Sequence, residues 1–85
     1  MENNIPPCPP HSFRVTLNLV FPESRLDNIL LQTLREQDEN MTLKHISRGA
    51  LKELFNEKKI QIKGQRAKSN SSVAKGITYV DILGF

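Results

Sequence analysis

Apolar and polar side chains alternate strictly near the start of the chain, in the segment HSFRVTLNLVF (11–21). One set of alternate positions is apolar: Phe13, Val15, Leu17, Leu19 and Phe21. The other set begins with Arg14, Thr16 and Asn18. Because successive side chains of a strand point to opposite faces, this pattern predicts a β-strand with one buried and one wet face, ended by Pro22.

Two later segments follow the helical period instead. Ser24, with Asp27 three residues later, resembles a capping box and predicts a helix that runs to about Glu36. Its buried stripe is expected to be Leu26, Ile29, Leu30 and Leu34. Ser47 is a good N-cap for a second helix, residues 47–57, whose apolar arc is Ala50, Leu51, Leu54 and Phe55. Residues 38–46 are predicted to form a loop, with one helical turn beginning at Thr42.

The remaining segments are rich in β-forming residues. Ile60 and Ile62 alternate with polar neighbours, which predicts a short strand, and Gly64-Gln65 is expected to form the turn after it. A polar segment around Val73 then precedes the β-rich segment ITYVDIL (77–83). The predicted fold is a small α+β domain in which two helices pack on a short antiparallel sheet, with an extra N-terminal strand at the edge.

Composition limits the possible functions of this chain. Four of its five prolines lie in the first ten residues, which predicts a disordered Pro-rich leader (1–11) before a single domain (12–85). A domain of about 75 residues buries only about 60% of its unfolded surface, so we expect no deep substrate pocket, no enzyme activity and no cofactor. Cys8 and His11 have no second pair of metal ligands nearby, so no metal site is expected.

The net charge of +3 conceals an uneven distribution. Residues 44–75 hold nine basic and two acidic side chains, a local charge of +7, whereas residues 1–43 hold three basic and six acidic ones, a local charge of −3. The second half is therefore expected to bind a polyanion. A single cysteine, the lack of a long apolar run and the lack of a secretory signal together predict a cytoplasmic protein that does not enter a membrane.

Several short motifs in this basic half and just before it occur in a fixed order. Arg25-Leu26-Asp27 with Leu30 opens the first helix, and Ser47-Arg48 opens the second. Lys52, Leu54, Ile60, Ile62 and Gly64 follow without a gap, and Val73 and Gly76 come before the last strand. Over about residues 25–82 the chain resembles the S-four-type RNA-binding domain, or alpha-L RNA-binding motif. That domain occurs in a ribosome-associated heat-shock protein and in the leader domains of pseudouridine synthases.

The chain departs from the family pattern at three positions. Lys58 stands where the family usually has the glycine that ends a helix through a left-handed residue, and this lysine predicts a different helix cap. Lys63 replaces an asparagine before the turn glycine, and Ile77 replaces an aspartate after the closing glycine. Two features resemble pseudouridine-synthase leader domains more closely than the shortest members of the family. These features are the long link between the two helices and the strand that precedes the motif.

The resemblance implies a monomer that binds structured RNA, either ribosomal or transfer RNA, with the ribosome as a further partner, and that has neither catalytic activity nor a small-molecule substrate. An arginine beside a helix N-terminus suits phosphate, because both the amides and the guanidinium favour an anion. The predicted RNA-binding residues are Arg25, Ser47, Arg48, Lys52, Lys58, Lys63, Gly64, Gln65, Lys68 and Lys75. Two alternatives are a protein-interaction module that uses the strand of residues 13–21 and a detached leader domain of a pseudouridine synthase. The protein-interaction hypothesis becomes better supported if the backbone of that strand is unpaired and the Arg48/Lys52 face is covered.

Overall fold

One antiparallel sheet organises the domain, which is known from a computed structural model that describes residues 10–85. The alternating segment forms β1 (Ser12–Leu19), which pairs along its whole length with β4 (Gly76–Leu83). β4 also pairs with β2 (Ile60–Ile62), and β2 pairs with β3 (Gln65–Arg66), so the strand order is β1-β4-β2-β3. The predicted edge position of the first strand is confirmed, and this strand supplies the longest pairing in the sheet. Most of the predicted leader lies outside the described residues.

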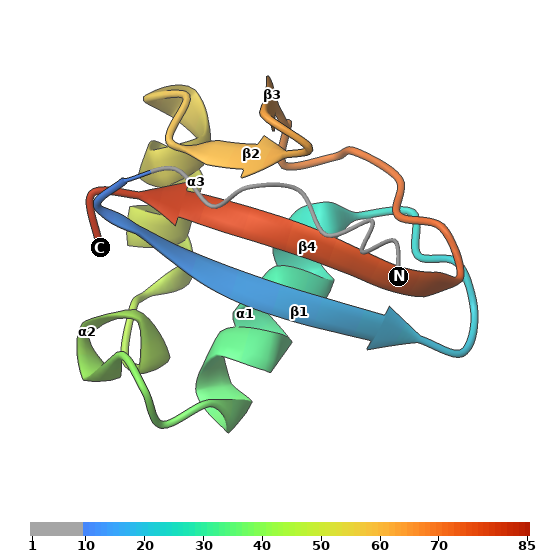
Figure 1. The fold of residues 1–85 in the computed structure, drawn as a ribbon, viewed down its shortest axis with the longest axis horizontal. Coiled ribbons are helices and arrows are strands. Elements are labelled where there is room, and N and C mark those ends of the chain that lie inside the picture. Colours follow the sequence, from blue (N-terminus) through green and yellow to red (C-terminus); the bar gives the residue numbers. More distant parts are fainter. Residues whose placement is uncertain (1–9) are drawn as a thin grey trace, which may run out of the picture.

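The helices pack against one face of this sheet. α1 (Leu26–Glu36) and α3 (Arg48–Asn56) lie behind the strands in Figure 1, and the short α2 (Met41–Lys44) links them. The core joins the helix-facing side of the sheet to the apolar stripes of the helices: Val15, Leu17, Leu26, Leu30, Leu34, Leu43, Leu51, Leu54, Phe55, Ile60, Ala67, Val73, Val80 and Ile82. The α+β class is therefore confirmed. No helix within residues 10–85 is long and apolar enough to cross a membrane.

The helices begin in different ways. The Ser47 hydroxyl accepts a hydrogen bond from the backbone N–H of Ala50 at 3.0 Å, so the predicted cap of α3 is confirmed. The capping box at Ser24 is wrong, because Arg25 occupies the N-cap position of α1 and makes no side-chain cap. Tertiary contacts replace the missing cap: the first N–H groups of α1 donate to the carbonyls of Ser71 and Ser69, at 2.9 and 3.0 Å.

Three further predictions need correction. Phe21 was expected in the core but is 73% exposed. β1 ends at Leu19, so the side chain of Phe21 does not lie on the buried face of the sheet. Ala50 is exposed because α3 buries only Leu51, Leu54 and Phe55, and Ala50 lies at the margin of that stripe. α2 begins at Met41 rather than at Thr42, since the Asn40 side chain accepts a bond from the N–H of Leu43 and sets the start.

Two turns flank β2, and each contains a lysine with a left-handed backbone. The turn between β2 and β3 is Lys63-Gly64, with φ of 55° and 76°, rather than the predicted Gly64-Gln65. The chain turns out of α3 at Lys58, the residue after the C-cap Glu57, and the φ of Lys58 is 64°. The N–H of Lys58 donates to Phe55 O and that of Lys59 donates to Leu54 O, at 3.1 and 3.0 Å, which is the Schellman arrangement. The prediction of a different helix cap is therefore wrong, because the lysine adopts the conformation usually left to glycine.

Candidate nucleic-acid interface

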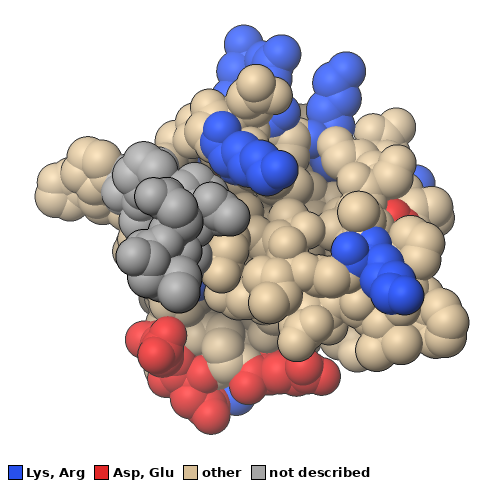
Figure 2. Space-filling view, turned by 45° about the vertical axis from the view of Figure 1, so that its right-hand side comes forward, with Lys and Arg blue, Asp and Glu red and all other residues tan. Residues whose placement is uncertain are grey.

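Basic and acidic side chains gather on different parts of the surface. In Figure 2, most visible Lys and Arg side chains lie toward the top and right, whereas most visible Asp and Glu side chains lie along the lower edge. In the sequence the acidic residues concentrate around the end of α1, at Glu36, Asp38 and Glu39. One of these, Asp38, forms an ion pair with Lys44 of α2. On the face shown, most basic side chains therefore lie apart from the acidic side chains that follow α1.

A first hollow, here called the helix hollow, lies between the N-terminal ends of α1 and α3. It is lined by Arg25, Asp27, Asn28, Arg48, Leu51, Lys52 and Ser69. Arg48 donates a hydrogen bond to the side-chain oxygen of Asn28 at 2.7 Å, which fixes its guanidinium across the gap between the two helices. Three of the predicted RNA-binding residues, Arg25, Arg48 and Lys52, therefore meet here although more than 20 positions separate Arg25 from the other two.

Asp27 is the one carboxylate of the helix hollow. Arg25 donates two hydrogen bonds to it, at 3.1 and 3.0 Å, and the N–H of Asn28 donates a third at 2.8 Å. The hydrogen bond from Arg25 is the largest cause that lowers the pKa of Asp27, desolvation opposes it, and the charge of Arg48 adds to the lowering. The same contact raises the pKa of Arg25. Asp27 is therefore ionised at neutral pH, and the hollow keeps a net positive charge from its three cations.

A second hollow, here called the turn hollow, adjoins the first and shares Arg25 and Ser69 with it. Its volume is about 420 Å³, and it is lined by Arg25, Phe55, Asn56, Lys58, Arg66, Ala67, Lys68, Ser69 and Asn70. Four of these residues are cations and none is acidic. The side chains of Asn56, Ser69 and Asn70 add neutral hydrogen-bonding groups. Such a lining suits an anion with several acceptor oxygens.

The two hollows adjoin because the loop before β4 runs against the start of α1. The carbonyls of Ser69 and Ser71 accept from the first two N–H groups of α1, and Glu23 and Val73 exchange two backbone bonds at 2.9 and 2.8 Å. The loop is itself closed by the N–H of Lys68, which donates to the Ser71 hydroxyl at 2.9 Å. Residues 68–70 are therefore held beside Arg25, although some 43 residues of chain separate them.

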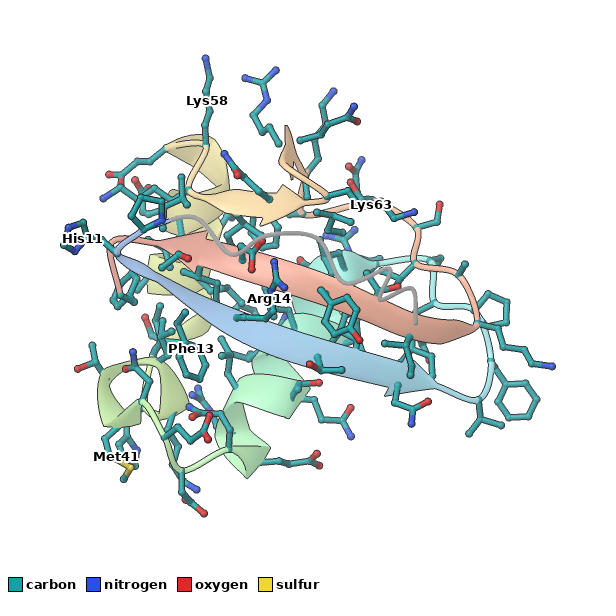
Figure 3. The ribbon with its side chains drawn as sticks, viewed as in Figure 1. His11, Phe13, Arg14, Met41, Lys58 and Lys63 are labelled. Atoms are coloured by element: carbon teal, nitrogen blue, oxygen red, sulfur yellow. The ribbon has the colours of Figure 1, made fainter. Side chains whose placement is uncertain are left out.

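The structure brings only some of the predicted residues together. Lys58 and Lys68 line the turn hollow with Arg25, and Ser47 caps the helix that carries Arg48. Three further predicted residues lie at the β2–β3 turn and line neither hollow: Lys63, Gly64 and Gln65. Figure 3 shows Lys58 and Lys63 at opposite ends of β2. Lys75 directly precedes β4 and also lies outside both hollows.

Sequence reasoning did not assign Arg66, Asn28 and Ser69 to the interface. No strand was predicted after the turn at Gly64-Gln65, whereas in the structure β3 makes Arg66 the partner of Gln61. Nothing local marks Asn28 or Ser69, because their roles depend on contacts between distant segments. Within the described part of the chain no three His, Cys, Asp or Glu side chains gather as metal ligands, and Cys8 lies outside it. No protein-family model, curated protein or solved structure matches this chain.

Proposed function

We propose that this domain binds structured RNA, without catalysis, through the surface formed by the helix hollow and the turn hollow. The observation that carries the proposal is the convergence of six cations from the start of α1, from α3 and the turn after it, and from β3 and the following loop: Arg25, Arg48, Lys52, Lys58, Arg66 and Lys68. The one carboxylate among them is already paired with Arg25. A surface of this kind suits the regularly spaced phosphates of a nucleic-acid backbone.

The resemblance to the alpha-L RNA-binding motif supports RNA rather than another polyanion. The family presents two helices and a hairpin as one basic surface for folded RNA, and here α1, α3 and the β2–β3 hairpin supply the corresponding elements. Ribosomal or transfer RNA, and the ribosome itself, are the partners that the resemblance implies. The same domain would serve equally as the RNA-binding leader of a pseudouridine synthase.

The test compares an RNA hairpin with a DNA duplex of equal charge, at about 50 and 200 mM salt. About four phosphate contacts predict that wild-type affinity for RNA falls by the order of 50- to 150-fold over this range. Arg48→Ala/Lys52→Ala should bind more weakly and lose roughly half of the salt dependence. Lys44→Ala/Lys59→Ala removes the same charge from cations that pair with Asp38 and Glu57 outside both hollows, and it should bind like wild type. Equal losses in both double variants, or no preference for RNA, would overturn the proposal.

The protein-interaction alternative depends on β1. β1 lies at an edge of the sheet, but its other side pairs with β4 over its full length, and both Arg48 and Lys52 are exposed rather than covered. The second condition for that alternative is therefore not met. Protein partners become the better hypothesis only if RNA binding proves insensitive to the Arg48→Ala/Lys52→Ala change.

A further inference from the structure

Lys58 occupies a backbone conformation that a lysine does not favour. Its φ of 64° lies in the left-handed region, where the Cβ of an L-residue crowds the neighbouring carbonyl oxygen. The Schellman bonds at this position use only backbone atoms, so glycine would make them equally well and without that crowding. Helix termination therefore explains the conformation but not the residue. His11 and Lys63 also have positive φ, so the surroundings of the Lys58 side chain, and not this conformation alone, decide what it does.

The side chain of Lys58 adds a fourth cation to the turn hollow. Arg25, Arg66 and Lys68 line the same space, and no carboxylate is among the lining residues. The nearby Glu57 forms its ion pair with Lys59 instead, at 3.4 Å. Like charges brought together in this way repel one another and oppose folding. Backbone conformation and electrostatics thus both disfavour a lysine here when the hollow is empty.

An anion in the hollow would reverse the electrostatic part of this cost. Arg66 can present paired N–H donors to phosphate oxygens, and Arg25 retains donors beyond the two that bind Asp27. The two lysines add charge without demanding a fixed geometry. Asn56, Ser69 and Asn70 supply further hydrogen-bonding groups from two different segments. Figure 3 shows Lys58 extending outward beyond the end of α3, where its flexible side chain can reach a ligand at the mouth of the hollow.

We propose that the turn hollow is a phosphate-binding subsite that holds a backbone phosphate of the bound RNA, and that Lys58 is a ligand of this phosphate. The inference rests on the proposed function and adds a specific site to it. Lys58 replaces the glycine usual in the resembling family, so this contact is a property of this chain. The lysine contributes to binding at the expense of stability.

The central experiment measures thermal stability and RNA affinity for Lys58→Gly and Lys58→Gln. Lys58→Gly relieves the left-handed strain and removes the charge, so the Tm should rise by about 4 °C or more while RNA binding weakens roughly three- to tenfold. For Lys58→Gly, the slope of log affinity against log salt concentration should become shallower by about one phosphate contact. Lys58→Gln should bind as weakly as Lys58→Gly but show a smaller rise in Tm, because it relieves the charge repulsion and keeps the strained side chain.

Two variants provide matched controls. His11→Gly relieves the same kind of strain, since His11 has a φ of 55°. His11 lies beside the start of β1 and outside both hollows. This variant should gain stability and bind RNA like wild type. Lys59→Gln removes a neighbouring charge that does not line the turn hollow, and its affinity should stay within about twofold of wild type.

A direct test of the subsite uses inorganic phosphate without RNA. At equal ionic strength, phosphate in place of chloride should raise the Tm of wild type more than that of Lys58→Gly, because bound ligand stabilises the folded state. Wild-type RNA affinity in Lys58→Gly, with affinity lost in Arg48→Ala/Lys52→Ala, would overturn the subsite and leave the proposed function standing. No loss in either variant would overturn both. A Tm of Lys58→Gly at or below wild type would refute the strain argument.

Discussion

The ion pair between Arg14 and Asp81 gives the sharpest prediction about stability. The two residues lie directly opposite each other on β1 and β4, and Arg14 donates two hydrogen bonds to the carboxylate, at 2.8 and 3.0 Å. Asp81 is 1% exposed, and the Arg14 guanidinium also lies over the Tyr79 ring, 5.3 Å from its centre. Arg14→Met keeps most of the apolar side chain but leaves a buried carboxylate without its cation.

The expected cost follows from burial. Breaking a buried ion pair by removing one partner costs about 3–5 kcal/mol. A domain of 85 residues is stable by about 4–13 kcal/mol in all, so Arg14→Met should remove about a quarter or more of the free energy of unfolding. The double variant Arg14→Met/Asp81→Leu removes both charges and should recover most of that loss, because no uncompensated charge remains.

Urea unfolding followed by circular dichroism at pH 7, on wild type, both single variants and the double variant, measures the coupling energy of the pair. The pair Arg25–Asp27 is a natural control, since it has the same two-bond geometry but its arginine side chain is 53% exposed. Arg25→Met should therefore cost far less than Arg14→Met. A loss below about 1 kcal/mol in Arg14→Met, or a double variant no more stable than the single one, would refute the reasoning.

Three smaller predictions concern caps, glycines and acid. Ser47→Ala should lower the free energy of unfolding by about 1 kcal/mol in urea titrations, because the N–H of the third helical residue loses its acceptor. Gly49→Ala should raise stability by about 0.5–1 kcal/mol, since a Cβ there meets nothing within 4 Å, whereas Gly76→Ala should lower it, because φ is 105°. The lowered pKa of Asp27 means that its contribution to stability is present above the unfolded pKa and is lost as pH falls through the folded pKa. Asp27→Asn should therefore flatten the fall in Tm on acidification, and an unchanged acid profile would contradict the role of Arg25 in lowering that pKa.

Local patterns were sufficient where a segment's own residues decide its structure. The alternation of residues 13–19 correctly predicted β1, and the Ser47 cap followed by an apolar stripe correctly predicted α3. Side-chain periodicity and a hydroxyl cap both act within a few residues. The same logic failed at Phe21 and Ser24. There the chain leaves β1 and meets the loop before β4, whose carbonyls replace the expected cap.

The α+β class, the two main helices, the edge strand and the concentration of positive charge in residues 44–75 could all be predicted from the sequence. The meeting of Arg25, Arg48 and Lys52 in one hollow, and of Arg66 with Lys58 in another, depends on tertiary contacts. The left-handed backbone of Lys58 also belongs to the tertiary structure, because it turns the chain from α3 into β2, which pairs with β4. The physical reason is the same in each case. Periodicity and capping act over neighbouring residues, whereas backbone bonds between distant segments fix which side chains share a site, and no local pattern encodes those bonds.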